Sequence, residues 1–500
     1  MIRGFGLLIL LLCIVSCSHK PVALETSFWY WHTPFQLFPK DVSQLQSMGV
    51  KRLFVRAGTF THSPEGVQLG IAQQWTGPKA AFPVVLVYNF DSGLLSHFGT
   101  LNLNDTSRTM IKAIEGSSQS AAAGGVQVEG VQLDIDSPTR LLPRYASLLH
   151  MVHAGLDRSW TFSATALSSW LTSKHVNEIA KEVDYLAPQF YESQVALTDD
   201  KPTTIADLNA LEEGLGKAAS LPVPFYAGVA GYGHSLLYNE RGQLAAVYRS
   251  LSPEDALRHT SFAFRSNAPL DKAGSVATAQ NYIGEDKLTL QAVRPGRGGK
   301  GLGYRLVFDL PNTRVLDREA RIVQERAPNN CRGMIIYRLP QEDDSFALSL
   351  SSAAAALRHQ PEALAISADV KSRENPWRTV ELTNQPRIRE LRLSLVNDGN
   401  VSSLAAPGSV TATVHLDKPG IEGASPGDFD NVEFGRLENG RFTHCMPGDA
   451  DTLLLQRGRI LAGQTLHSGA IQVVAHGPCQ VSWRVVGPGG FETVSGGVVK

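Results

Sequence analysis

The sequence predicts an α/β protein: a (β/α)8 barrel followed by a smaller all-β sandwich domain. From residue 27 to about 340, short apolar runs alternate with helical segments, which indicates parallel strands joined by crossover helices. After about residue 362, short alternating segments lie between clusters of Gly, Pro, Asn and Asp, as in antiparallel sandwiches. No glycine-rich dinucleotide fingerprint follows the first strand, which disfavours an open doubly wound sheet.

Eight apolar runs predict the barrel strands, and their number favours a closed barrel. They span residues 28–32, 52–57, 84–89, 130–136, 160–166, 184–191, 224–229 and 333–338. Helical stretches separate them at residues 41–48, 106–123, 140–156, 174–182 and 204–219, with a last helix near 345–358. The barrel is therefore expected to cover residues 27–360.

The connection between the seventh and eighth strands is long and predicts an insertion at about 234–331. Within it, two strand-like runs, 288–293 and 304–309, flank a Gly- and Arg-rich tract at 294–301. This tract lacks the Gly-Lys-Ser/Thr ending of a phosphate-binding loop, so it predicts a flexible hairpin loop. Residues 361–500 are expected to form the sandwich, with an immunoglobulin-like arrangement.

The first residues are typical of an export signal. A positive start precedes an apolar run that is too short to span a bilayer. The tract Ile14-Val15-Ser16-Cys17 resembles a lipobox, which implies a signal peptide over 1–16, a lipid on Cys17 and a tether over 17–26. An ordinary signal peptide with an incidental cysteine is the alternative. If the cell has two membranes, Ser18 after the cysteine favours anchoring to the outer membrane, facing the periplasm.

Composition limits the partners and cofactors. The formal net charge is -1 at pH 7, so no basic surface for nucleic acid is expected. No cluster of cysteine and histidine has the spacing of zinc ligands, and we expect neither a metal nor a cofactor. Export permits a disulfide, for which Cys445 and Cys479 are the candidate pair in the last domain.

Three polar residues alternate at the end of the fourth strand. In a barrel strand, side chains point alternately to the lumen and to the helices, so Gln132, Asp134 and Asp136 are expected to face the lumen together. Two carboxylates about 6.5–7 Å apart along a strand disfavour each other's ionisation, and one pKa should rise. A raised pKa suits a general acid. The alternative is that both carboxylates accept hydrogen bonds from backbone amides at the strand end.

This segment resembles a known signature. Residues 129–136 are similar to the Asp-Gly-x-Asp-x-Asp-x-Glu motif of family 18 glycoside hydrolases, which are chitinase-like enzymes. The resemblance puts the family's catalytic glutamate on Asp136, its last aspartate on Asp134 and its second aspartate on Gln132. Asp136 is one methylene shorter than glutamate, and Gln132 lacks the carboxylate, so this chain departs from the family at two positions.

Later strands carry further resemblances. Gln189-Phe-Tyr-Glu192 is similar to the family's sixth-strand Met-x-Tyr-Asp, which places Tyr191 beside the scissile sugar and Glu192 at the aspartate position. The tract containing Tyr232 is similar to the seventh-strand motif, and Tyr337 stands where the eighth strand has tryptophan. As a whole, the chain resembles an uncharacterised bacterial lipoprotein family of unknown function with a glycoside-hydrolase-like barrel.

Aromatic residues near the strand ends are candidates for stacking on sugar rings. Trp31 ends the first strand and Trp170 follows the fifth, while packing between barrel and helices is the alternative for each tryptophan. His32 and Asp91, at the ends of the first and third strands, are further candidates by position.

Two functions remain open from the sequence. The first is a cell-envelope glycosidase in which Asp136 is the general acid, Asp134 tunes it and Tyr191 orients the reacting group. The nucleophile would be the sugar's own acetamido oxygen, or else Glu192. The second is a non-catalytic glycan-binding or scaffolding lipoprotein, whose sandwich domain contacts a protein partner.

Overall fold

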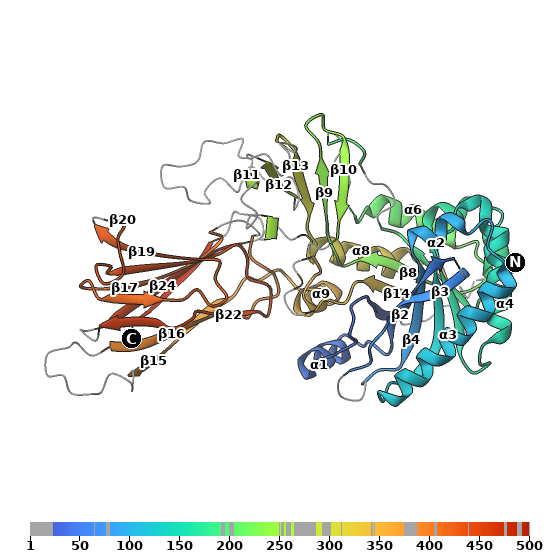
Figure 1. Ribbon diagram of the computed structural model, residues 1–500, viewed down its shortest axis with the longest axis horizontal. Helices are drawn as coiled ribbons and strands as arrows, with labels where there is room; N and C mark the ends of the chain where they lie inside the picture. The colour runs from blue at the N-terminus through green and yellow to red at the C-terminus, as the bar shows by residue number, and fades with distance from the viewer. Residues whose placement is uncertain are drawn as a thin grey trace, which may run out of the picture.

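A computed structural model describes residues 24–499 with internal gaps. The gaps fall at residues 65, 77–80, 192–195, 200–204, 250, 252–254, 257–261, 265–286, 293–301, 312, 342–343, 345, 375–387, 405–407, 439, 475–477 and 488–492. Figure 1 shows the barrel at one end of the long axis and the sandwich at the other. No helix among the described residues is long and apolar enough to cross a membrane.

Eight parallel strands close into a barrel, which confirms the predicted fold class. They are β1 (Glu25–Tyr30), β2 (Leu53–Ser63), β4 (Val84–Phe90), β5 (Val128–Asp134), β6 (Thr161–Leu167), β7 (Tyr185–Gln189), β8 (Phe225–Ala230) and β14 (Cys331–Tyr337). Each strand pairs with the next, and β1 closes the barrel by pairing with both β14 and β2.

Helices surround the barrel, and all but the last of them lie in the crossovers between its strands. They are α1 (Pro39–Ser47), α2 (Ser92–His97), α3 (Leu103–Ala123), α4 (Leu142–Gly155), α5 (Val176–Ala180), α6 (Leu208–Ala218), α8 (Thr313–Arg326) and α9 (Leu350–Leu357). Side-chain capping sets several helix starts. Asn102, for example, accepts hydrogen bonds from the amides of Asn104 and Asp105 at the start of α3.

Strand alternation divides the apolar residues into two layers. On β5, Val131 and Leu133 belong to the layer that packs under the helices. A smaller cluster fills the lumen and includes Trp29, Phe54, Val85, Val87, Tyr185, Ala187, Tyr226 and Ile335. The lumen is therefore a packed core in its lower part, and the polar residues of β5 lie above it.

The structure adds two features to the predicted barrel. A short strand, β3 (Gly66–Ala72), pairs antiparallel with the long β2 and was not predicted. The insertion after β8 forms a five-stranded antiparallel sheet of β9 (His234–Tyr238), β10 (Leu244–Tyr248), β11 (Phe262–Phe264), β12 (Lys287–Ala292) and β13 (Arg305–Asp309). The predicted pair of strands is present as β12 and β13, and the tract at 294–301 between them lies outside the described residues.

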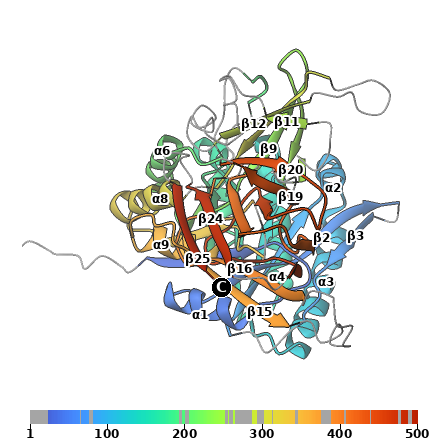
Figure 2. The same cartoon turned by 90° about the vertical axis from the view of Figure 1, so that its left-hand side faces the viewer.

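The C-terminal part is built from two antiparallel sheets with a shared core. One sheet holds β15 (Ile366–Glu374), β16 (Ile388–Asn397), β18 (Ile421–Ala424), β22 (Thr465–His467) and β23 (Ile471–Val474). The other holds β17 (Val410–Leu416), β19 (Asn431–Glu438), β20 (Arg441–His444), β21 (Thr452–Arg457), β24 (Cys479–Val486) and β25 (Thr493–Val499). Alternate residues of β16 and β17 fill the space between the sheets. Figure 2 shows these strands from the sandwich end.

The candidate disulfide is not formed in this domain. Cys445 and Cys479 are both free, with Cys479 buried. Cys445 follows β20 and Cys479 begins β24, and three strands lie between these two in the sheet. At about 4.8 Å for each strand spacing, that separation exceeds the roughly 4.4–6.8 Å between Cα atoms that a disulfide requires.

Candidate functional site

Gln132 faces the barrel lumen and is held there by two hydrogen bonds. Its Oε1 accepts from Trp29 Nε1 at 2.8 Å, and its Nε2 donates to Ser163 Oγ at 3.3 Å. Both Gln132 and Trp29 are buried. Gly228 on β8 leaves room for the indole, since a Cβ there would lie 3.1 Å from the ring. Gln132 and Trp29 therefore form the floor beneath the open end of the barrel.

Asp134 lies two residues after Gln132 on β5, closer to the open end of the barrel, and accepts hydrogen bonds from two side chains. Its Oδ1 accepts a hydrogen bond from Thr165 Oγ1 at 2.7 Å and another from Gln189 Nε2 at 3.1 Å. Burial, followed by the charge of Asp136, raises the pKa of Asp134 to about 7, and the two hydrogen bonds oppose that rise. Near neutral pH, Asp134 is thus divided between its protonated and ionised forms.

Asp136 lies beyond the last residue of β5 and is exposed. Besides burial, its charge raises the pKa of Asp134. Burial, followed by the charges of Asp134 and Asp136, also raises the pKa of the buried Tyr145 phenol. The pair therefore consists of one partly buried carboxyl group and one open to solvent. Such an asymmetric pair can move a proton from the inner group to the outer one.

Three tyrosines from the last barrel strands cluster beside these carboxylates. Tyr191 stacks on Tyr337 with ring centroids 5.8 Å apart, and Tyr232 meets both rings edge-on. Burial raises the pKa of Tyr191 well above its ordinary value, with smaller contributions from its tyrosine neighbours, Asp134 and Asp136. Tyr191 is therefore a neutral hydroxyl group near the carboxylate pair.

The aromatic cluster continues to the end of β1. Trp31 contacts Tyr337 with ring centroids 5.5 Å apart, and Arg56 places its guanidinium carbon 5.6 Å from the centroid of the Trp31 ring. His32, next along the chain, lies with Nε2 3.2 Å from the carbonyl oxygen of Leu339. Burial, then the charge of Arg338, lowers the pKa of His32. His32 is thus a neutral ring at this edge of the site.

Two of the predicted site residues make structural hydrogen bonds, and one is outside the described residues. Asp91 caps α2, accepting a hydrogen bond from the Leu94 amide at 2.6 Å. Trp170 is buried between barrel and helices, and its indole donates to the carbonyl oxygen of Ser137 at 3.1 Å. Glu192 belongs to the gap at 192–195. The structure brings together Asp134, Asp136, Gln132, Gln189, Tyr191, Tyr232, Tyr337, Trp31 and His32.

Sequence reasoning missed two residues of this site. Thr165 on β6 faces the lumen with Ser163 and Thr161, while Phe162 and Ala164 pack outward. This period of two in polar residues was the available signal. Arg56 carries no such signal, because a single arginine in an apolar run does not reveal which way it points.

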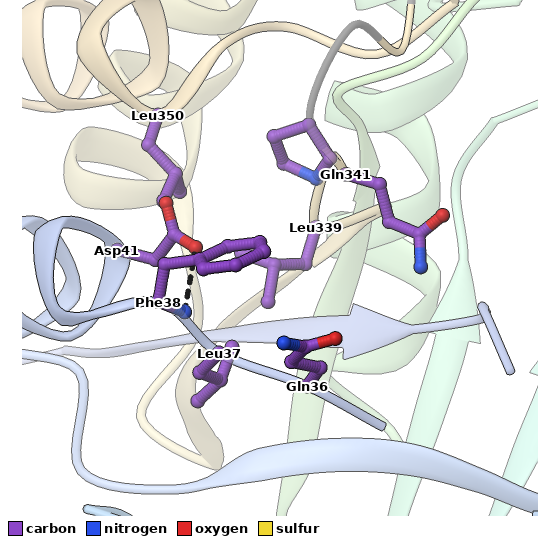
Figure 3. Close-up of a pocket in the computed structure, with 8 residues that line it drawn as sticks. Gln36, Leu37, Phe38, Asp41, Leu339, Gln341 and Leu350 are labelled. Atoms are coloured by element: carbon purple, nitrogen blue, oxygen red, sulfur yellow. Dashed lines mark hydrogen bonds between the residues drawn. The ribbon is translucent and has the colours of Figure 1, made fainter. Parts of the chain in front are cut away.

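A separate pocket of about 210 Å3 lies on the rim, between the start of α1 and the segment after β14. Figure 3 shows Phe38, Leu339 and Leu350 on one side and the amides of Gln36 and Gln341 on the other. Asp41 is part of the wall and accepts a hydrogen bond from the Phe38 amide at 3.0 Å. This pocket shares no residue with the carboxylate site. Among the described residues, no group of three or more His, Cys, Asp or Glu side chains could hold a metal ion.

Comparisons with known proteins place this site in context. Residues 90–252 match the family model described as Domain of unknown function (DUF3142). The matched segment covers β5, β6 and β7, with Asp134, Thr165 and Gln189. No curated protein matches the sequence.

Solved structures that resemble the chain include a chitinase, a spore cortex-lytic enzyme and a chitinase-like agglutinin. A chitinase from Chromobacterium violaceum has 15% identity and a TM-score of 0.38, covering 67% of this chain and 98% of its own. The spore cortex-lytic enzyme SleL of Bacillus megaterium has 14% identity and a TM-score of 0.42, with 67% and 73% covered. A chitinase-like agglutinin from Robinia pseudoacacia has 14% identity and a TM-score of 0.39, with 66% and 99% covered.

Proposed function

We propose that the mouth of the barrel binds a glycan and hydrolyses a glycosidic bond. The observation that carries this proposal is the carboxylate pair at the end of β5. Asp134 holds a pKa of about 7 beside the exposed Asp136. The C-terminal ends of barrel strands are where (β/α)8 enzymes place their catalytic groups. The tyrosine cluster supplies aromatic faces next to the pair, as sugar binding requires.

The proposed chemistry is acid catalysis of glycoside cleavage. Asp136, protonated through exchange with Asp134, gives its proton to the leaving glycosidic oxygen as the bond to the anomeric carbon breaks. Asp134, then ionised, stabilises the positive charge that develops on the sugar ring, and the Tyr191 hydroxyl orients the reacting group. The attacking group is an acetamido oxygen of the sugar or a second carboxylate, for which Glu192 is our candidate. Water then completes the hydrolysis.

A non-catalytic glycan-binding lipoprotein is the second candidate. The observation that favours it is the length of the Asp136 side chain. An aspartate falls short of a glutamate by about 1 Å, and a misplacement of that size at a proton-transfer site can cost about a hundredfold in rate. In this case the aromatic cluster would hold the sugar, and the sandwich domain would contact a protein partner.

A hydrolysis and binding screen separates these candidates. The chain lacking residues 1–17 is tested against amino-sugar and neutral glycans, beside the variants Asp136→Asn and Asp134→Asn. Under the proposal, Asp136→Asn abolishes turnover and retains binding. Asp157→Asn, an exposed aspartate in the turn before β6, is the matched control and keeps full turnover. Turnover retained by Asp136→Asn would remove this residue from the acid role, and binding without turnover in the native chain would favour the second candidate.

We also propose that the protein is exported and lipid-anchored through Cys17, on the outer membrane facing the periplasm. The support is the tract Ile14-Val15-Ser16-Cys17, which lies outside the described residues. Metabolic labelling with a fatty acid should mark the native chain and leave Cys17→Ser unlabelled. Labelling that persists in Cys17→Ser would contradict the anchor.

A further inference from the structure

Arg56 is a positive charge at the mouth of the barrel. It lies on β2, one residue beyond Val55, which pairs with Tyr30 at the end of β1, and two residues after Phe54, whose side chain belongs to the lumen cluster. Its guanidinium carbon lies 5.6 Å from the centroid of the Trp31 ring, and its Nη2 lies 3.5 Å from the hydroxyl of Thr33. The side chain is partly buried, and its Nε is buried without a hydrogen-bond partner.

Two other arginines near the barrel strands have carboxylate partners. Arg52, immediately before β2, lies 2.9 Å from Glu129, and Arg338, after β14, lies 3.0 Å from Asp344. For Arg56, no carboxylate within the described parts of the chain comes within 4.0 Å. Among the described residues, its side chain contacts the Thr33 hydroxyl group and the face of the Trp31 ring.

A partly buried guanidinium without a carboxylate partner destabilises the protein when no ligand is bound. Removing a guanidinium from water is unfavourable unless a partner replaces the lost hydration, and burial accordingly lowers the pKa of Arg56. The Trp31 face compensates in part through a cation–π contact, and Thr33 accepts one long hydrogen bond from Nη2, but the Nε–H of Arg56 has no partner in the part of the chain that the structure describes. A guanidinium can form two parallel hydrogen bonds to a planar anion.

Arg56 and the carboxylate pair are joined by one run of aromatic rings. Arg56 contacts the Trp31 ring, Trp31 contacts Tyr337, and Tyr337 stacks on Tyr191. The charges of Asp134 and Asp136 contribute to the raised pKa of the Tyr191 hydroxyl group. A sugar chain lying along these rings would therefore meet a cation at one end and the two carboxylates at the other. A negative group on that chain is repelled at the carboxylate end and attracted at the Arg56 end.

We propose that Arg56 binds a carboxylate carried by the glycan, so that the ligand of this site is an acidic polysaccharide. This inference rests on the proposed glycan function. One unpaired guanidinium balances the single charge of a carboxylate, whereas a phosphate monoester would bring nearly two charges toward a site that already contains Asp134 and Asp136. The sugar at Arg56 is therefore acidic, and the sugar beside Asp136 is neutral.

The test compares two tetrasaccharides with the same β-1,4-linked backbone. Cellotetraose is neutral, and its uronate counterpart carries a single carboxylate, at C6 of one terminal sugar. Isothermal titration calorimetry should show tighter binding of the uronate by the chain lacking residues 1–17. Arg56→Met should weaken uronate binding by about tenfold to a hundredfold, the loss of hydrogen bonds to a charged group, and leave cellotetraose binding unchanged. Arg56→Lys keeps the positive charge but lacks the planar guanidinium, so it should recover only part of the affinity for the uronate.

Two controls separate a ligand-binding role from a structural one. Arg321→Met removes an exposed arginine on α8 and should change neither affinity. Thermal unfolding of Arg56→Met should occur at or above the native temperature, because no ion pair is lost. A lower unfolding temperature together with equal loss of both tetrasaccharides would show that Arg56 is structural and would overturn the proposal.

A third measurement tests Arg56 without any glycan chain. Sodium glucuronate should move the NMR signal of the Arg56 Nε–H, assigned by its absence in Arg56→Met, and glucose should not. If neither tetrasaccharide binds but glucuronate moves this signal, the carboxylate site stands and the glycan function fails. If glucuronate leaves the signal in place, the Arg56 proposal is overturned, whether or not the tetrasaccharides bind.

Discussion

Thr165 donates a hydrogen bond of 2.7 Å to Asp134 across the neighbouring strands β6 and β5. The two residues are 31 positions apart in the chain, and the parallel pairing of Leu133 with Ala164 sets them side by side. The bond favours the ionised carboxylate, so it opposes the burial that raises the pKa of Asp134. The pKa of Asp134 in the proposed acid pair thus depends in part on Thr165 of the neighbouring strand.

Replacing Thr165 with valine removes this hydroxyl group at nearly constant volume. We expect the pKa of Asp134 to rise further above 7, by about one unit, because a hydrogen bond to a charged group is worth about 1.5–3 kcal/mol. Carboxyl 13C NMR of the native chain and the variant checks this. Thr161→Val, at the other end of β6, is the control and should leave the Asp134 titration in place. An unchanged or lower pKa in Thr165→Val would contradict this role for the hydroxyl group.

Glu319 makes the stability of the barrel depend on pH. It lies on α8 and is 1% exposed, with Oε1 3.5 Å from the Ala230 amide at the end of β8. Burial raises its pKa to about 8 from a usual 4.5. Below pH 4.5 the side chain is neutral in both the folded and unfolded states. Between pH 4.5 and 8 the unfolded chain ionises first, so the free energy of unfolding falls as the pH rises.

Glu319→Gln should remove this pH dependence. The variant keeps an amide oxygen for Ala230 and has no charge to bury. At pH 8 we expect it to be more stable than the native chain by on the order of 4 kcal/mol, with little difference at pH 4.5. Urea unfolding at the two pH values measures this. Glu325→Gln, on the exposed face of the same helix, should show no such difference. An equal stability of the native chain and Glu319→Gln at pH 8 would show that Glu319 is not held neutral.

The barrel could be predicted because its signal is local. Each strand is a short apolar run, each helix has its own periodicity, and eight repeats of the unit imply closure. The inward direction of Gln132 and Asp134 followed from the same alternation along one strand. By contrast, β3 pairs with β2 through a register shift between Thr59 and Phe60, and no pattern within its seven residues indicates that partner.

The aromatic residues show where local reasoning stops. Trp31 and Trp170 both follow strands, yet Trp31 joins the tyrosine cluster and Trp170 packs under the helices. What separates them is the path of the chain after each strand, which depends on distant contacts. Arg56 was missed for the same reason, since its place in the site depends on Trp31, which follows the neighbouring strand β1. The carboxylate pair could therefore be predicted from the sequence, whereas only some of the residues around it could.

Gln132 and Trp29 should be energetically coupled. Gln132→Leu leaves the buried indole N–H of Trp29 without its partner at 2.8 Å, and we expect a loss of about 1–3 kcal/mol in the free energy of unfolding. In a Trp29→Phe background no indole N–H remains, so Gln132→Leu should cost less. A double-mutant cycle by urea unfolding measures the difference. Additive losses would mean that the hydrogen bond contributes nothing to stability.

The two cysteines of the sandwich should react with thiol reagents at different rates. Cys479 is buried and its pKa is raised to about 11 by burial, so at pH 8 it is protonated and shielded. Cys445 is partly exposed. We expect a maleimide to label Cys445 in the native chain and Cys479 only after unfolding, with peptide mass spectrometry to locate the label. A protein that resists labelling at both positions until it is reduced would instead contain the disulfide.

Asp344 holds two basic residues at the edge of the site, and its removal should affect both. It accepts bonds of 3.0 and 3.1 Å from Arg338 Nη2 and lies 3.6 Å from His32 Nε2, and both Asp344 and Arg338 are nearly buried. The charge of Asp344 raises the pKa of His32, against burial and Arg338, which lower it. Asp344→Asn should therefore lower the His32 pKa further below 6.5, as followed by NMR of the imidazole nitrogens.

The same variant should cost several kcal/mol of stability, because it leaves the Arg338 guanidinium without its counter-charge in a site with little solvent. Asp105→Asn is the matched control. Its partner Arg108 is 76% exposed, and a solvated ion pair of this kind contributes at most about 1 kcal/mol. Urea unfolding of both variants should separate them clearly. Equal losses, or a His32 pKa that rises in Asp344→Asn, would show that Arg338 and His32 do not depend on this carboxylate.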